Sequence, residues 1–226
     1  MKQNIDRISI QVGLSGYSFK IEAGSDVHSS EWMSADRIFA TSEFQKRYDS
    51  VEIAVFTPKF TLVPSSFFKS EDLRGHLSSV ASVSDEDPVE YVELPDYDAV
   101  LVYSNTVGVT LSKVISETVV HLDGTKSRSL PVVFFMLEKI RELSDYNKVM
   151  AAYMDGILYL VIVQGDSLLL CNSYEAPDFT TAQYFIFLAM KRLQLNTEVS
   201  TITFVTKLDE DQEMSLYRYF RSIEYL

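Results

Sequence analysis

Residues 8–21 read Ile-Ser-Ile-Gln-Val-Gly-Leu-Ser-Gly-Tyr-Ser-Phe-Lys-Ile, and this stretch carries the clearest structural signal in the chain. Apolar and polar residues alternate over 8–12 and again over 17–21. Such alternation is typical of strands that bury one face. The Gly-Leu-Ser-Gly segment at 13–16 separates the two runs and has the composition of a turn. The sequence therefore predicts a β-hairpin at the start of the chain.

A second set of strands is predicted in the C-terminal part of the chain, where Asp155-Gly156 separates two apolar runs. An Asp-Gly pair in that position is the strongest short-range hairpin signal. A third run follows Gln164-Gly165-Asp166, so we expect a three-stranded antiparallel meander. The elements expected here are strands over 148–154, 157–163, 167–173 and 201–205, a helix over 178–193 that is apolar nearly all round and therefore buried, and a helix over 209–223 with acids in its first turn.

Helices and strands also alternate after the first hairpin. Ser34 is a suitable N-cap for the first helix, and Pro131 stands early in the last one, where its missing N–H costs little. The predicted elements are helices over 35–48, 70–79, 107–117 and 129–143, and strands over 51–56, 60–63, 99–103 and 118–122.

The two parts of the chain share this order of elements. Each begins with antiparallel strands and continues with alternating helices and strands, which implies a mixed sheet flanked by helices. We therefore predict an α/β protein with two pseudo-repeated halves, residues 1–145 and 146–226. The repeat is one of architecture, because the halves share no evident sequence identity.

Residues 84–98 differ in composition from the rest of the first half. They include seven acids and two prolines and no basic residue. We interpret the segment as a solvated connection, which is the usual role of a run of like charges. The alternative is that these carboxylates bind a cation or a basic partner.

Composition excludes several classes of partner. The formal net charge is −12, from 32 acids against 20 lysines and arginines, and no run of basic residues interrupts it. Nucleic acids and anionic membrane surfaces repel such a chain, so neither is expected as a partner. The longest apolar run, 157–163, is far shorter than the ~20 residues of a membrane-spanning helix, so no membrane insertion is expected.

The only cysteine, Cys171, cannot form a disulfide within the chain, and residues 1–7 contain no apolar signal core. Both features favour a reducing, cytoplasmic environment. Cys171 lies in an apolar run and is interpreted as a small core residue. Three scattered histidines, His28, His76 and His121, offer no pair at ligand spacing, so no metal site is predicted.

Three blocks of sequence carry a family resemblance. They are residues 8–21, the segment Phe60-Thr-Leu-Val-Pro64, and the segment 168–174 followed by Asp178, Phe179 and Tyr184. Together they resemble an uncharacterised bacterial family of unknown function with an actin-like (Hsp70-like) ATPase fold, which is ribonuclease H-like. More distantly, the chain is similar to the actin-like assembly proteins of type IV pilus and type II secretion machines. The resemblance implies this fold and implies almost nothing about activity.

The resemblance also implies what the end of the chain should contain. An actin-like half normally continues with a further strand and helix, whereas this sequence stops at Tyr225-Leu226, directly after a predicted helix. Either the second half is abbreviated or the sequence lacks a tail.

The same resemblance points to two hairpins that bind phosphates in active relatives, the first of which holds an acid that positions Mg²⁺. Here Gln11 stands at the place of that acid, and a neutral amide cannot replace a carboxylate at a magnesium site. What remains is a vestigial phosphate hairpin formed by Gly13, Ser15 and Gly16. Asp155-Gly156 lacks the glycine and threonine run of a second cradle and is interpreted as a plain turn. We expect no cofactor; ATP with Mg²⁺ is disfavoured but left open.

One further motif resembles a catalytic signature. His121-Leu-Asp-Gly-Thr125 is similar to the Asp-x-Asp-Gly-Thr sequence of aspartyl-phosphate phosphatases, but a histidine stands where the nucleophilic carboxylate belongs. A strand that ends in an Asp-Gly turn explains the motif better. The sequence therefore assigns no catalytic residue.

Two functions remain as hypotheses. The first is a non-catalytic actin-like module that acts through a protein partner, which the sequence does not identify. The alternative is a divergent ATP-binding ATPase or kinase whose missing carboxylate comes from Asp155 or Asp123. A weaker option is dimerisation through an exposed sheet edge or through the apolar C-terminal end; the sequence does not fix the oligomeric state.

Overall fold

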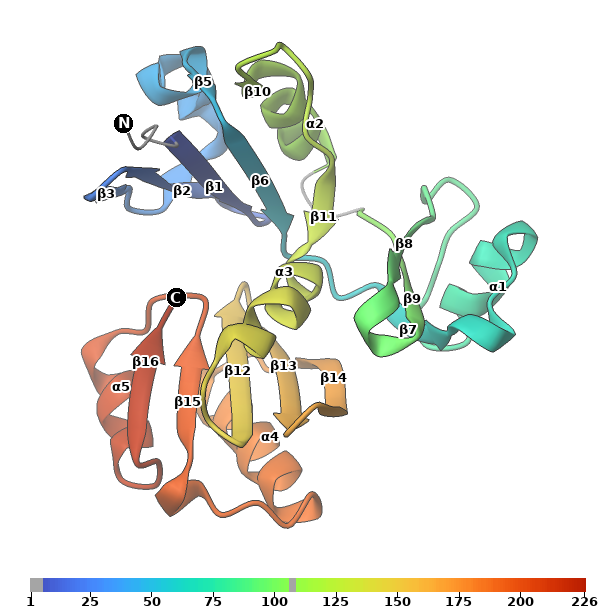
Figure 1. Cartoon of the computed structure of the whole chain (residues 1–226), viewed down its shortest axis with the longest axis vertical. Helices are drawn as coiled ribbons and strands as arrows, with labels where there is room; N and C mark the ends of the chain where they lie inside the picture. The colour runs from blue at the N-terminus through green and yellow to red at the C-terminus, as the bar shows by residue number, and fades with distance from the viewer. Residues whose placement is uncertain (1–5, 106–108) are drawn as a thin grey trace. The chain divides into compact units, whose positions relative to one another are not determined.

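The computed structural model describes residues 6–105 and 109–226, which form two compact units (Figure 1). Unit 1 comprises the chain up to Phe60 together with Asp72–Glu90 and Tyr103–Val132, and unit 2 comprises Thr61–Glu71, Tyr91–Val102 and Val133–Leu226. No helix in these described ranges is long and apolar enough to cross a membrane.

The main sheet of unit 1 contains the hairpin that residues 8–21 predict. The first two strands pair antiparallel with Ile8 opposite Ile21, and the first strand pairs in parallel with a later one. The strands are β1 (Asp6–Val12), β2 (Gly16–Ala23), β3 (Asp26–Ser29), β4 (Met33–Ser34), β6 (Ser50–Val55) and β11 (Ser129–Pro131). Their order is β11-β6-β1-β2-β3, and β4 pairs with the start of β2.

Alternation along β1 gives this sheet one apolar and one polar face. Ile8, Ile10 and Val12 are buried in a cluster that also contains Phe44 and Ile115. The elements that supply the rest of unit 1 around this sheet are the 3₁₀ helices η1 (Ala35–Ala40) and η2 (Ser42–Gln45), the helix α2 (Val109–Thr118), and the short paired strands β5 (Arg47–Tyr48) and β10 (Val120–His121). The start of the predicted helix 107–117 falls on residues 107–108, which lie outside the described ranges.

The predicted helix over 35–48 is wrong, because two 3₁₀ helices and a short strand occupy its place. Thr41 interrupts the segment in an extended conformation. Its hydroxyl donates to the Arg37 carbonyl at 3.1 Å and lies 2.6 Å from the hydroxyl of the buried Tyr17. These side-chain bonds compete with helical hydrogen bonding. Ser34 also makes no capping hydrogen bond, since its hydroxyl donates to Asp36 instead.

A small sheet, absent from our prediction, lies between β6 and β11 in sequence. It has the order β7-β9-β8. Residues 84–98, predicted to be a solvated connection, contain β8, whose Leu94 is buried while its acids are exposed. The predicted helix 70–79 is shorter and begins with a 3₁₀ turn. The elements are β7 (Phe60–Pro64), η3 (Ser65–Phe67), η4 (Ser70–Asp72), α1 (Leu73–Ser78), β8 (Glu90–Leu94), η5 (Pro95–Tyr97) and β9 (Ala99–Tyr103).

The sheet of unit 2 confirms the predicted meander, and its order is β14-β13-β12-β15-β16. Helices α4 and α5 lie against one face of this sheet (Figure 1). Ile186 of α4 and Leu216 of α5 belong to the apolar core cluster of this unit. The elements are α3 (Val132–Lys139, which begins at the end of unit 1), η6 (Ile140–Glu142), β12 (Asn147–Met154), β13 (Ile157–Gln164), β14 (Ser167–Glu175), α4 (Phe179–Arg192), η7 (Thr197–Val199), β15 (Thr201–Phe204), α5 (Glu210–Tyr217) and β16 (Ser222–Tyr225).

Three further helix predictions need correction. The last helix ends at Tyr217 instead of residue 223, and the segment that follows is β16, in parallel register with β15. Helix α4 is not buried all round, since Tyr184 is 60% exposed. The helix predicted from residue 129 begins only at Val132, because Ser129–Pro131 forms β11 beside β6.

The two main sheets have the same topology, which is the basis of the pseudo-repeat. In unit 1, β3, β2 and β1 run antiparallel to their neighbours, and β1, β6 and β11 run parallel. Unit 2 repeats this arrangement. Its antiparallel part is β14-β13-β12, and its parallel part is β12-β15-β16. Strand β16 is thus the counterpart of β11. The expectation that the chain stops directly after a helix, without this strand, is wrong.

Candidate functional site

The β1–β2 turn, where the sequence placed a vestigial phosphate hairpin, is tight and held by its own backbone. The Gly13 N–H donates to the Gly16 carbonyl at 2.9 Å, and the flanking pair is Val12 opposite Tyr17. Gly13 and Gly16 are buried, whereas Leu14 and Ser15 at the tip are exposed. The structure therefore brings the three candidate residues Gly13, Ser15 and Gly16 together in one turn.

Gly16 is required by a close backbone approach from the same unit. Its φ is +156°, and a methyl group at this position would lie 1.9 Å from the Met33 carbonyl oxygen. Met33 belongs to β4, which pairs with Gly16 and Tyr17 of β2. The space that a glycine leaves beside its Cα is thus filled by the carbonyl of β4.

Ser15 is also engaged within the chain. Its hydroxyl oxygen accepts a hydrogen bond from the indole Nε1–H of Trp32 at 3.0 Å. Trp32 directly precedes β4, so the segment 32–34 contacts the turn through both its side chain and its backbone. Sequence reasoning missed this contact, because no local pattern links residue 32 to residue 15.

Gln11 lies in the body of β1 and not in the turn. It pairs with Ser18 of β2 and Ala54 of β6 and is half-buried on the polar face of the sheet. The nearest carboxylate on that face by register is Glu52, two residues away along the strands, or about 7 Å. Its Oε2 accepts a hydrogen bond from the Ser9 hydroxyl at 3.1 Å. No acid therefore stands at position 11 or directly beside it in the β1–β2 and β1–β6 registers.

The second candidate turn, Asp155-Gly156, is a two-residue hairpin with positive φ at both residues, 51° and 74°. This is the type I′ geometry that Asp-Gly favours, and the predicted plain turn is confirmed. The Gly156 carbonyl accepts a hydrogen bond from the Ala176 N–H at 2.8 Å, which fastens the turn to the end of β14.

Asp123, the other acid considered as a substitute carboxylate, organises its own turn. Its Oδ1 accepts hydrogen bonds from the Thr125 hydroxyl at 2.7 Å and the Thr125 N–H at 2.9 Å, and these bonds lower the pKa of the carboxyl. The neighbouring His121 ring lies 2.7 Å from the Ser127 hydroxyl. The Asp-Gly turn interpretation is confirmed, since Gly124 has φ +82°.

Cys171 lies on β14, in the apolar run where it was predicted. Burial raises the pKa of its thiol to about 12. The thiol therefore stays protonated at neutral pH. By exposure Cys171 is half-buried, so it is not one of the fully buried core residues.

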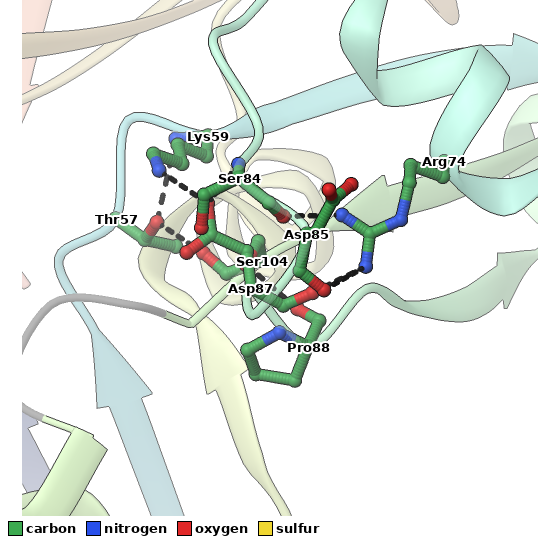
Figure 2. A network of polar contacts seen from close by, with 8 residues as sticks. All are labelled: Thr57, Lys59, Arg74, Ser84, Asp85, Asp87, Pro88 and Ser104. Atoms are coloured by element: carbon green, nitrogen blue, oxygen red, sulfur yellow. Dashed lines mark hydrogen bonds and ion pairs between the residues drawn. The ribbon is translucent and has the colours of Figure 1, made fainter.

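A network of polar contacts in unit 1 surrounds the acidic loop before β8 (Figure 2). Lys59 Nζ lies 2.7 Å from Asp87 Oδ2, which also accepts the Ser84 N–H at 3.0 Å. Arg74 donates to the carbonyls of Ser84, Asp85 and Asp87. The hydrogen bond from Lys59, followed by that from Ser84, lowers the pKa of Asp87 to about 2. Part of the acidic segment is therefore already neutralised by the chain.

Two buried hydroxyls continue this network below the loop (Figure 2). Thr57 donates to the Ser104 carbonyl at 2.6 Å, and Ser104 donates to the Pro88 carbonyl at 2.6 Å. These bonds connect three parts of the chain that are far apart in sequence, at residues 57, 88 and 104. Within residues 6–105 and 109–226, no group of three or more His, Cys, Asp or Glu side chains is arranged to hold a metal ion.

The chain was compared with known proteins by sequence and by structure. The sequence model of a family described as "Protein of unknown function (DUF3822)" matches residues 6–223. A Bacteroides thetaiotaomicron protein with an actin-like ATPase fold and unknown function has a TM-score of 0.68 and 16% identity, covering 100% of this chain and 92% of that one. The PilM-PilN type IV pilus biogenesis complex has a TM-score of 0.52 and 14% identity, covering 99% and 88%. No curated protein sequence matches the chain. The chain has an actin-like ATPase fold, as its residues predict.

Proposed function

Because this chain belongs to the DUF3822 family, whose function is unknown, we propose that it is a non-catalytic actin-like protein that acts by binding another protein. The observation that carries the proposal is the β1–β2 turn. The Met33 carbonyl oxygen lies where a side chain at Gly16 would begin, and the Ser15 hydroxyl accepts a hydrogen bond from Trp32. Phosphate-binding turns need backbone N–H groups that a ligand can approach closely. Here segment 32–34 lies against the turn beside Gly16 and bonds to the Ser15 hydroxyl.

The absence of an acid at position 11 supports the same proposal. Magnesium ions are bound in proteins chiefly through carboxylates and phosphate oxygens. Gln11 offers a neutral amide, and Glu52 on the same sheet face is engaged by Ser9. A nucleotide at this turn would therefore lack the group that holds its metal.

The proposed mode of action, binding to a protein partner, takes its support from one structural neighbour. The PilM-PilN structure is that of a complex, and the chain matched in it is similar in fold to this protein at a TM-score of 0.52. We also propose that the two halves divide near residue 145. All strands of the sheet β11-β6-β1-β2-β3 precede this residue, and all strands of the sheet β14-β13-β12-β15-β16 follow it.

Trp32 provides the test, because it is the only tryptophan in the chain and is bonded to the turn in question. We expect ATP with Mg²⁺ to leave its fluorescence unchanged and to give no heat of binding by calorimetry. Ser15→Ala serves as the control, since loss of the hydrogen bond should shift Trp32 emission and so show that the probe senses the turn. Saturable, magnesium-dependent binding would contradict the proposal and favour a divergent ATP-binding enzyme.

A further inference from the structure

Helix α4 of unit 2 has an outer face whose sequence does not suit solvent. Residues 179–190 contain no acid and no base, although the helix covers only one face of the sheet (Figure 1). Surface helices usually carry charged side chains on the side opposite the core. Helix α5, which packs in the same apolar cluster, follows this rule, since its first turn contains Glu210, Asp211 and Glu213. The sequence of α4 is instead typical of a helix that is covered on all sides.

One stripe of α4 points away from the core of unit 2. Helical spacing, in steps of three and four residues, places on this stripe Thr180, Tyr184, Phe187 and Lys191. Tyr184 is 60% exposed, Thr180 and Lys191 are also exposed, and Phe187 is half-buried. The other side of the helix is buried and consists of Ala182, Ile186, Ala189 and Met190.

Aromatic rings make up the exposed part of this stripe. The ring of Tyr184 stands beside that of Phe185, with centroids 5.4 Å apart. The ring of Phe187 lies 4.8 Å from that of Tyr219, which is 51% exposed. The buried centres of protein interfaces are enriched in tyrosine and phenylalanine and depleted of charged residues. The outer face of α4 therefore has the composition of an interface.

The charges at the two ends of α4 indicate what covers this face. Asp178 is the N-cap, and Lys191 and Arg192 lie in the last turn. Among the residues that the structure describes, no ion pair engages either base. The midpoint between Asp178 and Lys191 falls next to Tyr184. A second α4, packed antiparallel about a two-fold axis at this midpoint, would bring each Lys191 beside Asp178 of the other copy and would oppose the two helix dipoles.

We propose that α4 is a self-association surface, through which two copies of this chain pair antiparallel. Such a contact is isologous, because each copy contributes the same patch. A helix of 14 residues is about 21 Å long, so one helix pair lies near or below the lower limit of stable interfaces, about 1,200 Å² in total. The dimer is therefore weak and depends on concentration. This inference goes beyond the proposed function and does not rest on it.

Sedimentation velocity of the full chain tests the proposal, at about 5–500 µM protein and about 0.15 M salt, which screens the net negative charge. We expect the sedimentation coefficient to rise with concentration toward that of a dimer. Tyr184→Glu places two like charges at the centre of the pair and should weaken association by about 10-fold or more. Tyr146→Glu is the matched control, since it makes the same change at a 69% exposed tyrosine of the same unit and should leave association unchanged.

A double-mutant cycle tests the antiparallel arrangement. Asp178→Asn keeps a capping side chain but removes its charge, and Lys191→Gln removes the opposite charge. Each change alone should weaken the dimer roughly 2- to 30-fold, because the two-fold axis creates two exposed ion pairs. Lys191→Gln should have no further effect in the Asp178→Asn background.

Three results would each overturn the inference. They are a monomer at every concentration, equal weakening by Tyr184→Glu and Tyr146→Glu, and independent effects of the two charge changes. If the face of α4 instead binds a different protein, the first of these results is expected. The ATP titration of Trp32 is unaffected by any of them, so the two proposals fail separately.

Discussion

At the scale of single residues, Gly16 owes its identity to the carbonyl of Met33, which approaches β2 more closely than any side chain would allow. The sequence marks this glycine as part of a turn, and by family resemblance as part of a phosphate cradle. The structure gives it a second role in the pairing of β2 with β4. That role depends on a contact 17 residues away, between Gly16 and Met33, which no local pattern reveals.

We expect Gly16→Ala to lower the free energy of unfolding by about 3 kcal/mol, because a backbone clash adds to an unfavourable φ. Gly124→Ala is the matched control. It has φ +82° with nothing within 4 Å of the new methyl group, so it should cost only about 1–2 kcal/mol. Denaturant unfolding measures both values. Equal costs would show that β4 yields to the methyl group.

The ion pair of Lys59 with Asp87 should make the stability of the fold depend on pH in the acidic range. The pKa of Asp87 is lowered from 3.8 to about 2, so the folded state favours the ionised carboxyl. Its stabilising contribution is complete above the unfolded pKa and is lost as the pH falls toward 2. In Lys59→Met we expect the Asp87 pKa, followed by carboxyl NMR, to rise toward 3.8. An unchanged pKa would show that the Ser84 N–H alone determines it.

At the scale of elements, helix starts differ in whether the capping side chain is used. The Asp178 carboxylate accepts the Thr181 N–H at 2.7 Å and begins the 14-residue helix α4. Ser34, which the sequence marks equally well as a cap, precedes only a 3₁₀ turn and makes no such bond. A capping residue is therefore informative only together with a sustained helical pattern after it.

Asp178→Ala should lower the free energy of unfolding by about 1 kcal/mol, the usual cost of a lost N-cap. Ser34→Ala should change it by less than about 0.5 kcal/mol, since Ser34 caps nothing. Thermal or denaturant unfolding of the two variants tests the contrast. If the two costs were similar, capping at Asp178 would not be what stabilises the start of α4.

Helices and strands with a clear periodic spacing of apolar residues were predictable from the sequence, and short elements were not. The hairpin at 8–21, the meander from β12 to β14 and helix α4 follow from alternation, the Asp-Gly turn and length. Strand β16 was not predicted, because Phe220 and Ile223 are three residues apart and fit the face of a helix that continues to residue 223. Both side chains are buried in the structure.

At the scale of the whole molecule, the fold was predictable because both halves repeat one order of elements. The acidic composition of segment 84–98 hid one strand of the small sheet, since β8 contains two glutamates among its five residues. The candidate turn at Gly13–Gly16 was located correctly, but its contacts with Trp32 and Met33 were not.

The shared strand order has a practical consequence for protein engineering. Between β6 and β11 the chain contains an additional three-stranded sheet, whereas the equivalent link from β15 to β16 contains only α5. The shared strand order is therefore unchanged although a whole sheet is inserted at this point in one of the two repeats. The exposed Lys207, just after β15, is the corresponding place to graft a fluorescent or affinity module.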